Sequence, residues 1–235
     1  MKKVSLLLAL LTTSLFFAQG GQSHGANLSG GSVDASFRQT FDAVNYNGFH
    51  LAKKSGPKVL GTPFAFKNAP MVLNTTEGKS FKVPNGNYNA KSNYIVSNFA
   101  KDSSFVFNAG SIESVKIDKY VAKQFITERG KKRFFFDATP RASVKLLKQF
   151  VATIKQGQVN VMTKLKTSQD KYILRDYLLI SKDGKTAEKI RFKKKTILKL
   201  FNDKKDLIEK FVVDNNLSYK DETDLVKIFN YYSIN

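Results

Sequence analysis

The chain has 235 residues and no cysteine, and its 39 lysine and arginine residues outnumber 19 aspartate and glutamate residues, for a formal net charge of +20. The absence of cysteine excludes disulfide bonds, thiol nucleophiles and thiolate metal sites, so a hydrophobic core must hold the fold together. The positive charge favours anionic partners, although it does not choose among nucleic acid, anionic lipid and acidic polysaccharide.

The N-terminal segment, residues 1–19, reads MKKVSLLLALLTTSLFFAQ and predicts a cleaved secretory signal peptide. Two lysines precede a short apolar run, as in signal peptides, and a Thr-Thr-Ser tripeptide interrupts that run. The uninterrupted stretch falls short of the ~20 apolar residues that a membrane-spanning helix needs. We therefore expect a periplasmic or secreted protein, whose charge falls to +18 once Lys2 and Lys3 are removed.

The mature chain divides by pattern into a lead-in, a β-rich part and a helical end, which predicts an α+β fold. Residues 20–43 are rich in glycine and are expected to form a flexible lead-in. Residues 44–193 contain short runs of alternating apolar and polar residues, separated by turn signals. This pattern favours an antiparallel β-meander domain over βαβ units.

Three dipeptides mark expected chain reversals within the β-rich part: Glu77-Gly78, Asn85-Gly86 and Asp183-Gly184. Asparagine and glycine tolerate the positive φ angles that tight turns require. Residues 111–117 alternate between apolar and polar, which predicts a half-buried strand. Residues 143–156 fit a helix face in part and a strand in part, and we favour the strand.

The pattern becomes helical after residue 193, and residues 194–235 predict short helices packed on the β domain. Helix starts are expected at Thr196, Asp203 and Asp221, and a helix end is expected at Asn215-Asn216. Helices this short are not stable in isolation, so they must dock on the sheet or on one another.

Seven basic residues in two clusters are the candidate anion-binding residues: Arg129, Lys131, Lys132, Arg133, Lys193, Lys194 and Lys195. The first cluster precedes three phenylalanines, residues 134–136. Cations beside aromatic rings suit single-stranded nucleic acid, because rings stack on bases while charges hold phosphates. The same composition also suits a membrane interface. We favour the plainer interpretation, in which the three phenylalanines are core residues of a strand and the basic stretch is the exposed turn before it.

The sequence offers little for catalysis, and we expect no enzymatic activity, no metal site and no cofactor. His24 lies in the lead-in and His50 stands alone, so neither a Ser–His pair nor a clustered metal site is indicated. No phosphate-binding loop or dinucleotide motif is present. Asp102 and Glu113 could act as a carboxylate pair only if their strands are neighbours.

Several stretches resemble an uncharacterised family of secreted or periplasmic proteins from flavobacteria and related bacteria. They are GTPFAFKN, GKSFKVPNGNYNAKSN, KDSSFVFNAGSIESVKI and the tail KKKTILKLFNDKKDLIEKFVVDNNLSYKDETDLVKIFNYY. The resemblance covers about residues 58–232. It implies a periplasmic or secreted location and carries over no functional residues.

The favoured hypothesis is a non-catalytic cell-envelope protein that binds an anionic component through its basic surface. The component would be a lipid head group, lipopolysaccharide or an acidic glycan. A nucleic-acid-binding protein is the first alternative, and a hydrolase with a carboxylate pair is the second. The sequence does not indicate the oligomeric state.

Overall fold

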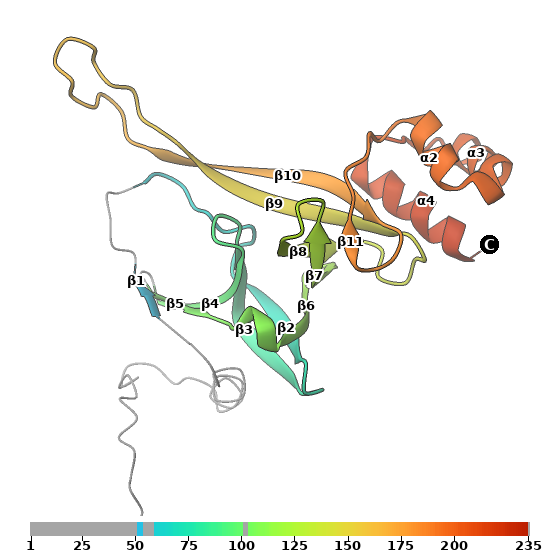
Figure 1. Cartoon of the computed structure of the whole chain (residues 1–235), viewed down its shortest axis with the longest axis horizontal. Coiled ribbons are helices and arrows are strands. Elements are labelled where there is room, and N and C mark those ends of the chain that lie inside the picture. The colour runs from blue at the N-terminus through green and yellow to red at the C-terminus, as the bar shows by residue number, and fades with distance from the viewer. Residues whose placement is uncertain (1–50, 54–58, 101–102, 235) are drawn as a thin grey trace, which may run out of the picture. The chain divides into compact units, whose positions relative to one another are not determined.

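The computed structural model describes residues 51–53, 59–100 and 103–234. The expected signal peptide, the expected lead-in and both histidines lie outside these ranges, as does Asp102. Strands come first in the chain and helices last (Figure 1). The strands are β1 (Leu51–Lys53), β2 (Ala69–Thr75), β3 (Ser80–Asn89), β4 (Tyr94–Ala100), β5 (Ser103–Val106), β6 (Ile112–Ile117), β7 (Tyr120–Thr127), β8 (Lys132–Asp137), β9 (Lys145–Lys155), β10 (Lys171–Ser181) and β11 (Thr186–Ala187).

In the described part of the chain, these 11 strands form one sheet of mostly antiparallel pairs, so the expected α+β class with C-terminal helices is confirmed. The strand order is β1-β5-β4-β3-β2-β6-β7-β8-β9-β10, and β11 pairs with β7 in parallel. A single meander would place each strand beside the next one in the sequence. Instead β2 pairs with β6 as well as β3, so two meanders, β2–β5 and β6–β10, join along β2 and β6.

The three expected reversals have three different outcomes. Gly78 has a φ of 79° in the turn between β2 and β3, which confirms the first. The expectation at Asn85-Gly86 is wrong, because both residues lie inside β3, at a register shift opposite β2. Asp183-Gly184 does form a tight turn, with Gly184 at a φ of 70°. However, the segment after it meets β10 through one isolated bridge and pairs instead with β7.

Strand β8 is buried on both faces and organises the core. Phe136 lies within 4.9–6.2 Å, between ring centroids, of four other aromatic rings: Phe66, Tyr88, Tyr120 and Phe150. Phe135 points to the opposite face, into a second apolar cluster with Phe125, Leu147, Leu179 and Ala187. Residues 134–136 are therefore core residues with an exposed fraction of at most 1%.

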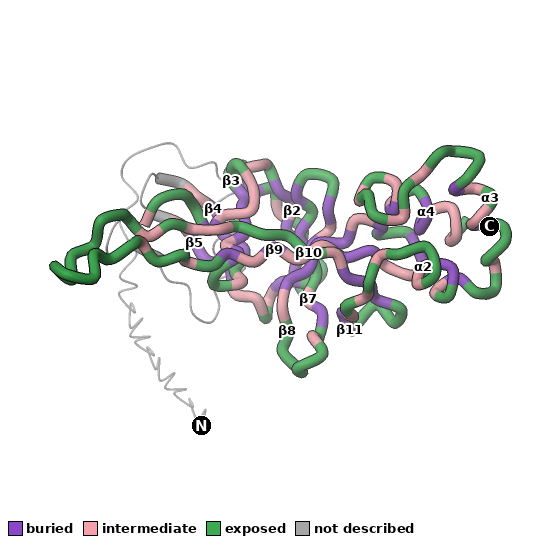
Figure 2. Tube along the Cα trace, turned by 90° about the horizontal axis from the view of Figure 1, so that it is seen from above, coloured by how far each residue is buried: buried purple, intermediate pink, exposed green. Residues whose placement is uncertain are grey.

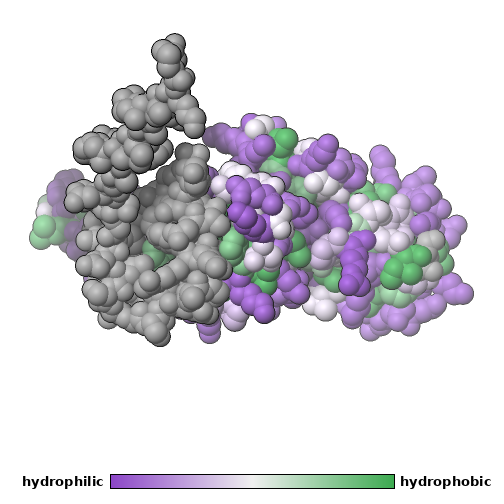
Figure 3. Space-filling model, turned by 90° about the horizontal axis from the view of Figure 1, so that it is seen from below, coloured by the Kyte–Doolittle hydropathy of each residue, from purple (hydrophilic) through white to green (hydrophobic). Residues whose placement is uncertain are grey.

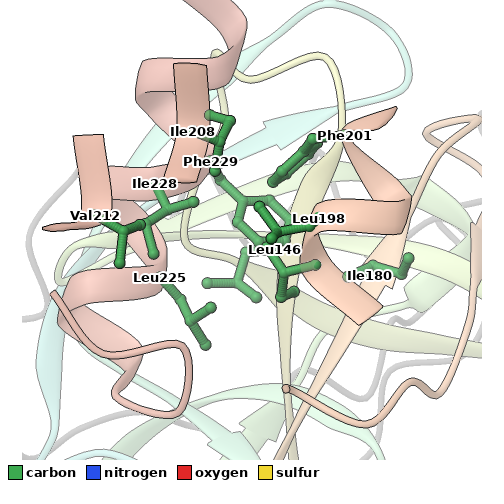
Figure 4. Close-up of a cluster of buried hydrophobic side chains, with 10 residues drawn as sticks. Leu146, Ile180, Leu198, Phe201, Ile208, Val212, Leu225, Ile228 and Phe229 are labelled. Carbon is green, nitrogen blue, oxygen red and sulfur yellow. The ribbon is translucent and has the colours of Figure 1, made fainter. Parts of the chain in front are cut away.

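The helices pack against one end of the long β9–β10 hairpin. They are α2 (Lys194–Leu200), α3 (Lys205–Asp214) and α4 (Glu222–Ile234), with the 3-10 turn η2 (Asn202–Lys204) between α2 and α3. A separate 3-10 turn, η1 (Ala109–Ser111), lies between β5 and β6. Figure 4 shows Leu146 of β9 and Ile180 of β10 in the same cluster as Phe201, Ile208 and Phe229. This shared apolar cluster explains how helices of 7, 10 and 13 residues are stable.

The helix ends agree with the sequence in part. Asp221 accepts a 3.1 Å hydrogen bond from the backbone N–H of Asp224, as expected of an N-cap. Asn216, which follows the C-cap residue Asn215 of α3, has a φ of 49°, as expected of a helix stop. The other two expected starts are wrong, because α2 and α3 begin after Lys193 and Lys204 without a side-chain cap. Among the described residues, no helix is long and apolar enough to span a membrane.

Candidate anion-binding pocket

A pocket of about 360 Å³ opens beside the turn that joins β7 to β8. Its walls come from that turn, from β9 and β10, and from β11 with the residues after it. The lining residues are Thr127, Glu128, Arg129, Lys131, Arg133, Phe135, Gln149, Leu179, Ala187 and Lys189. The volume lies within the range of small-molecule sites, at its lower end.

Local hydrogen bonds fix the β7–β8 turn and thereby position its basic residues. Thr127 donates from its backbone N–H to the carbonyl of Lys131 (2.9 Å) and accepts from Gly130 (2.8 Å). Gly130 has a φ of 73°, which a residue with a side chain rarely adopts. Glu128 Oε1 accepts a 3.1 Å hydrogen bond from the backbone N–H of Lys189, which ties the turn to the segment after β11.

The floor of the pocket is apolar. Phe135, Leu179 and Ala187 contribute to the lining and belong to the second core cluster, with exposed fractions of 0%, 3% and 2%. Buried apolar side chains beneath a polar rim suit a ligand that carries an apolar portion next to a charged group.

The rim of the pocket is strongly cationic. It carries Arg129, Lys131, Arg133 and Lys189 against one carboxylate, that of Glu128. Within residues 59–98 and 104–234, Arg129, Lys131 and Lys189 form no ion pair, whereas eight other pairs link lysines to acids. These three cations are therefore available to an anionic ligand.

Arg133 is shared between the pocket and the core. Burial raises the pKa of Tyr88 to about 12, while the charge and hydrogen bond of Arg133 act in the opposite direction. The Tyr88 hydroxyl also donates a 3.0 Å hydrogen bond to Asn93 Oδ1. Since the Arg133 side chain already interacts with a core residue, the role that we assign to it in the pocket is secondary.

The seven candidate residues do not form one site. Arg129, Lys131 and Arg133 line the pocket, but Lys132 does not. Strand alternation places Lys132 on the opposite face of β8, where it is exposed. The second cluster lies at the start of α2, outside the pocket lining, and its Lys194 forms an ion pair with Glu209 of α3.

The sequence patterns do not mark several of the pocket residues as parts of one site. Lys189 belongs by sequence to the basic stretch before α2, yet it joins Arg129 in space. Gln149, Leu179 and Ala187 carry no sequence signal of a site, because an amide or an apolar residue in a strand is ordinary. The parallel pairing of β11 with β7, which places Ala187 opposite Thr127, is the contact that brings the distant segments together.

The other proposed site residues are not brought together. Phe134 and Phe136 are buried in the core, so they cannot stack on bases as the nucleic-acid alternative requires. Glu113 is exposed on β6 and does not line the pocket, and its proposed partner Asp102 lies outside the described residues. Among the described residues, no group of three or more acidic or histidine side chains could hold a metal ion.

A second polar cluster lies where α4 meets the sheet, and its members satisfy one another. Lys148 of β9 places its Nζ 2.8 Å from Asp176 Oδ2 and 2.5 Å from Glu222 Oε2. Burial alone lowers the pKa of Lys148, but hydrogen bonds to Asp176 and Glu222 outweigh it and raise that pKa. Tyr120 donates a 2.6 Å hydrogen bond to Glu222 Oε1. This cluster links α4 to the sheet through side chains that pair with one another.

Comparisons with known proteins give no match: no protein family fits the sequence, and neither a curated protein nor a solved structure is similar to the chain.

Proposed function

We propose that this chain is a non-catalytic cell-envelope protein whose pocket binds the phosphate-bearing head of an anionic amphiphile. The observation that carries the proposal is the pocket itself, which has a cationic rim directly above a buried apolar floor. Phosphate oxygens would accept hydrogen bonds from Arg129, Lys131 and Lys189, and the first carbon atoms of the apolar portion would cover the floor.

The apolar floor distinguishes among the anionic components of an envelope. Phospholipids and lipopolysaccharide both place phosphate beside hydrocarbon, and both therefore fit the pocket. An acidic glycan has charge but no hydrocarbon to lie over the apolar part of the lining, so it would use only the rim. A periplasmic or secreted location, which the expected signal peptide implies, would bring the protein to both amphiphiles.

Soluble short-chain lipids test the pocket without a membrane. We use dihexanoyl phosphatidic acid below the concentration at which it forms micelles, in ~0.15 M salt, which screens exposed charges. We expect it to bind in titration calorimetry, and we expect dihexanoyl phosphatidylcholine to bind much more weakly. The double variant Arg129→Gln/Lys131→Gln should weaken phosphatidic acid binding at least about tenfold, because it removes two charge-assisted contacts. Competition by lipopolysaccharide then shows which amphiphile binds more tightly.

The second basic cluster supplies a matched control. Lys193→Gln/Lys195→Gln removes the same charge from exposed residues outside the pocket and should leave the affinity unchanged. Equal losses in both double variants would mean that only the overall charge attracts the lipid. That result, or equal binding of phosphatidylcholine, would overturn the proposal.

A further inference from the structure

The tip of the β9–β10 hairpin exposes apolar side chains far from the helices. Val159, Val161, Met162 and Leu165 have exposed fractions of 49%, 78%, 90% and 68%. Every residue from 158 to 169 is exposed, and Figure 2 shows the tip as a continuous exposed segment. In Figure 3 hydrophobic and hydrophilic atoms lie together at this end of the hairpin.

The tip is held in a defined turn, although nothing in the described chain covers it. Asn160 Oδ1 accepts hydrogen bonds from the backbone N–H groups of Met162 (2.8 Å) and Thr163 (3.1 Å). The backbone N–H of Asn160 donates to the carbonyl of Leu165 (2.9 Å), and Lys164 adopts a left-handed φ of 56°. The turn thus fixes the positions from which Val161, Met162 and Leu165 project.

The base of the tip is closed by a close approach of two backbones. A Cβ atom on Gly157 would lie 1.9 Å from the carbonyl oxygen of Ser168, so only glycine fits there without movement. Asp170 Oδ1 accepts a 2.8 Å hydrogen bond from the backbone N–H of Gly157 and a 2.7 Å hydrogen bond from Lys166 Nζ. These contacts keep the two arms together beneath the apolar turn.

Basic residues surround the apolar ones. Residues 155–171 contain four lysines, at positions 155, 164, 166 and 171, and a single acid, Asp170. Asp170 already pairs with Lys166. Apolar side chains flanked by lysine are typical of segments that enter the interface of an anionic bilayer, where hydrocarbon takes up the apolar groups and phosphates pair with lysine. The segment from 155 to 171 has no aromatic ring with which to stack on nucleic-acid bases.

The hairpin is long enough to hold the tip well away from the helices. The 11 residues of β10 run from Ser181 beside the helices to Lys171 near the tip. At about 3.3 Å per residue, this strand alone spans roughly 35 Å. A bilayer could therefore take up the tip without touching the helices.

We propose that residues 159–165 form a membrane-insertion tip, which places Val161, Met162 and Leu165 in the interfacial region of a bilayer that contains anionic lipid. Lys164 and Lys171 then pair with lipid phosphates. The site is separate from the pocket and does not depend on the function proposed for it. It makes the protein a peripheral membrane binder with the hairpin as its anchor.

A single environment-sensitive probe tests the insertion directly. Because the chain has no cysteine, Thr163→Cys can be labelled with the fluorophore NBD at one position in the full chain. With vesicles of phosphatidylglycerol and phosphatidylcholine, we expect a blue shift of NBD emission and quenching by brominated acyl chains. Vesicles of phosphatidylcholine alone should bind at least about tenfold more weakly. The same probe at Lys220→Cys, on the exposed loop before α4, should show no shift.

A second variant separates insertion from general attraction. Val161→Ser/Leu165→Ser, carrying the same probe, keeps every charge and should weaken vesicle binding at least about tenfold. The pocket variant Arg129→Gln/Lys131→Gln should keep the blue shift, so the two proposals fail independently. An unshifted probe at residue 163 in the presence of anionic vesicles would overturn the proposal. So would a shift that grows with protein concentration in the absence of vesicles, because it would mean self-association of the tips.

Discussion

Tyr120 and Glu222 are 102 residues apart in the sequence, and the hydroxyl of Tyr120 donates a 2.6 Å hydrogen bond to Oε1 of Glu222. The other carboxylate oxygen of Glu222 accepts a 2.5 Å hydrogen bond from Lys148 Nζ. Glu222 is the first residue of α4, whereas its two partners lie on β7 and β9. The cluster therefore links the start of the last helix to the sheet, beside the apolar contacts of Leu146.

We expect Glu222→Gln to lower the free energy of unfolding by about 1–2 kcal/mol, because it removes a charged partner from the mostly buried Lys148. The Lys148 and Glu222 side chains are only 13% and 22% exposed. Urea denaturation measures the change. Glu209→Gln breaks the exposed pair with Lys194 and should leave the urea midpoint unchanged. Equal effects of the two substitutions would contradict the structural role of the cluster.

The effect of Glu222 should depend on pH. Burial alone raises the pKa of Glu222, but hydrogen bonds from Lys148 and Tyr120 outweigh it and hold that pKa below its ordinary value of 4.5. A carboxylate with a lowered folded pKa contributes stability above its unfolded pKa and loses it as the pH falls through the folded value. The stability difference between wild type and Glu222→Gln should thus be full near pH 7, shrink below about pH 4.5 and approach its minimum below the folded pKa. Urea midpoints of both proteins at several pH values measure this. A constant difference would contradict the assignment.

Local sequence signals predicted the elements but not all of their connections. The strand predicted in residues 111–117 is β6, although its buried side chains, Ile112, Ser114, Val115 and Ile117, do not alternate strictly along it. Asparagine followed by glycine is typical of a turn, so the sequence predicts one at Asn85-Gly86. Inside β3 the same glycine instead gives room to Met71, a contact that only the pairing of β2 with β3 creates. Whether this glycine marks a turn or a close contact inside a strand therefore depends on the partner strand, which local sequence does not indicate.

Only part of the candidate pocket is predictable from the sequence. Arg129, Lys131 and Arg133 stand out as a cluster because they lie close together in the sequence. Lys189 and Ala187 reach the same place because β11 runs parallel to the end of β7. A parallel pair of two residues leaves no periodic pattern in the sequence, so this part of the site required the structure.

The close packing of Gly86 against Met71 predicts an effect of added volume. A Cβ atom at position 86 would lie 2.3 Å from Met71 Cγ, and Met71 is only 2% exposed. Gly86→Ala should cost about 1–3 kcal/mol of unfolding free energy through overpacking. Gly110→Ala, whose nearest neighbour would be Asn108 Oδ1 at 3.4 Å, is the milder control.

A double-mutant cycle tests the mechanism of that loss. If Met71 is the obstacle, Met71→Ala should make room for the new methyl group, so the double variant Met71→Ala/Gly86→Ala should be more stable than the sum of the two single effects predicts. Chemical denaturation of all four proteins provides the cycle. Strict additivity would show that Gly86 is needed for its backbone conformation and not for the space that it leaves.

Phe229 provides the test of how the helices depend on their shared cluster. Its side chain is fully buried, and its ring centroid lies 5.0 Å from that of Phe201, at an interplanar angle of 80°. Phe229→Ala should lower the free energy of unfolding by about 3–5 kcal/mol, because it opens a cavity between α2, α4 and the end of the β9–β10 hairpin. Val213→Ala in α3 removes methyl groups from a side chain that is 71% exposed and should have little effect.

Hydrogen exchange adds a spatial readout to the Phe229→Ala experiment. Faster exchange in α2 and α4, with unchanged exchange in β2–β6, would show that the helices can undock from a sheet that stays folded. A loss as small as that of Val213→Ala would contradict the packing shown in Figure 4.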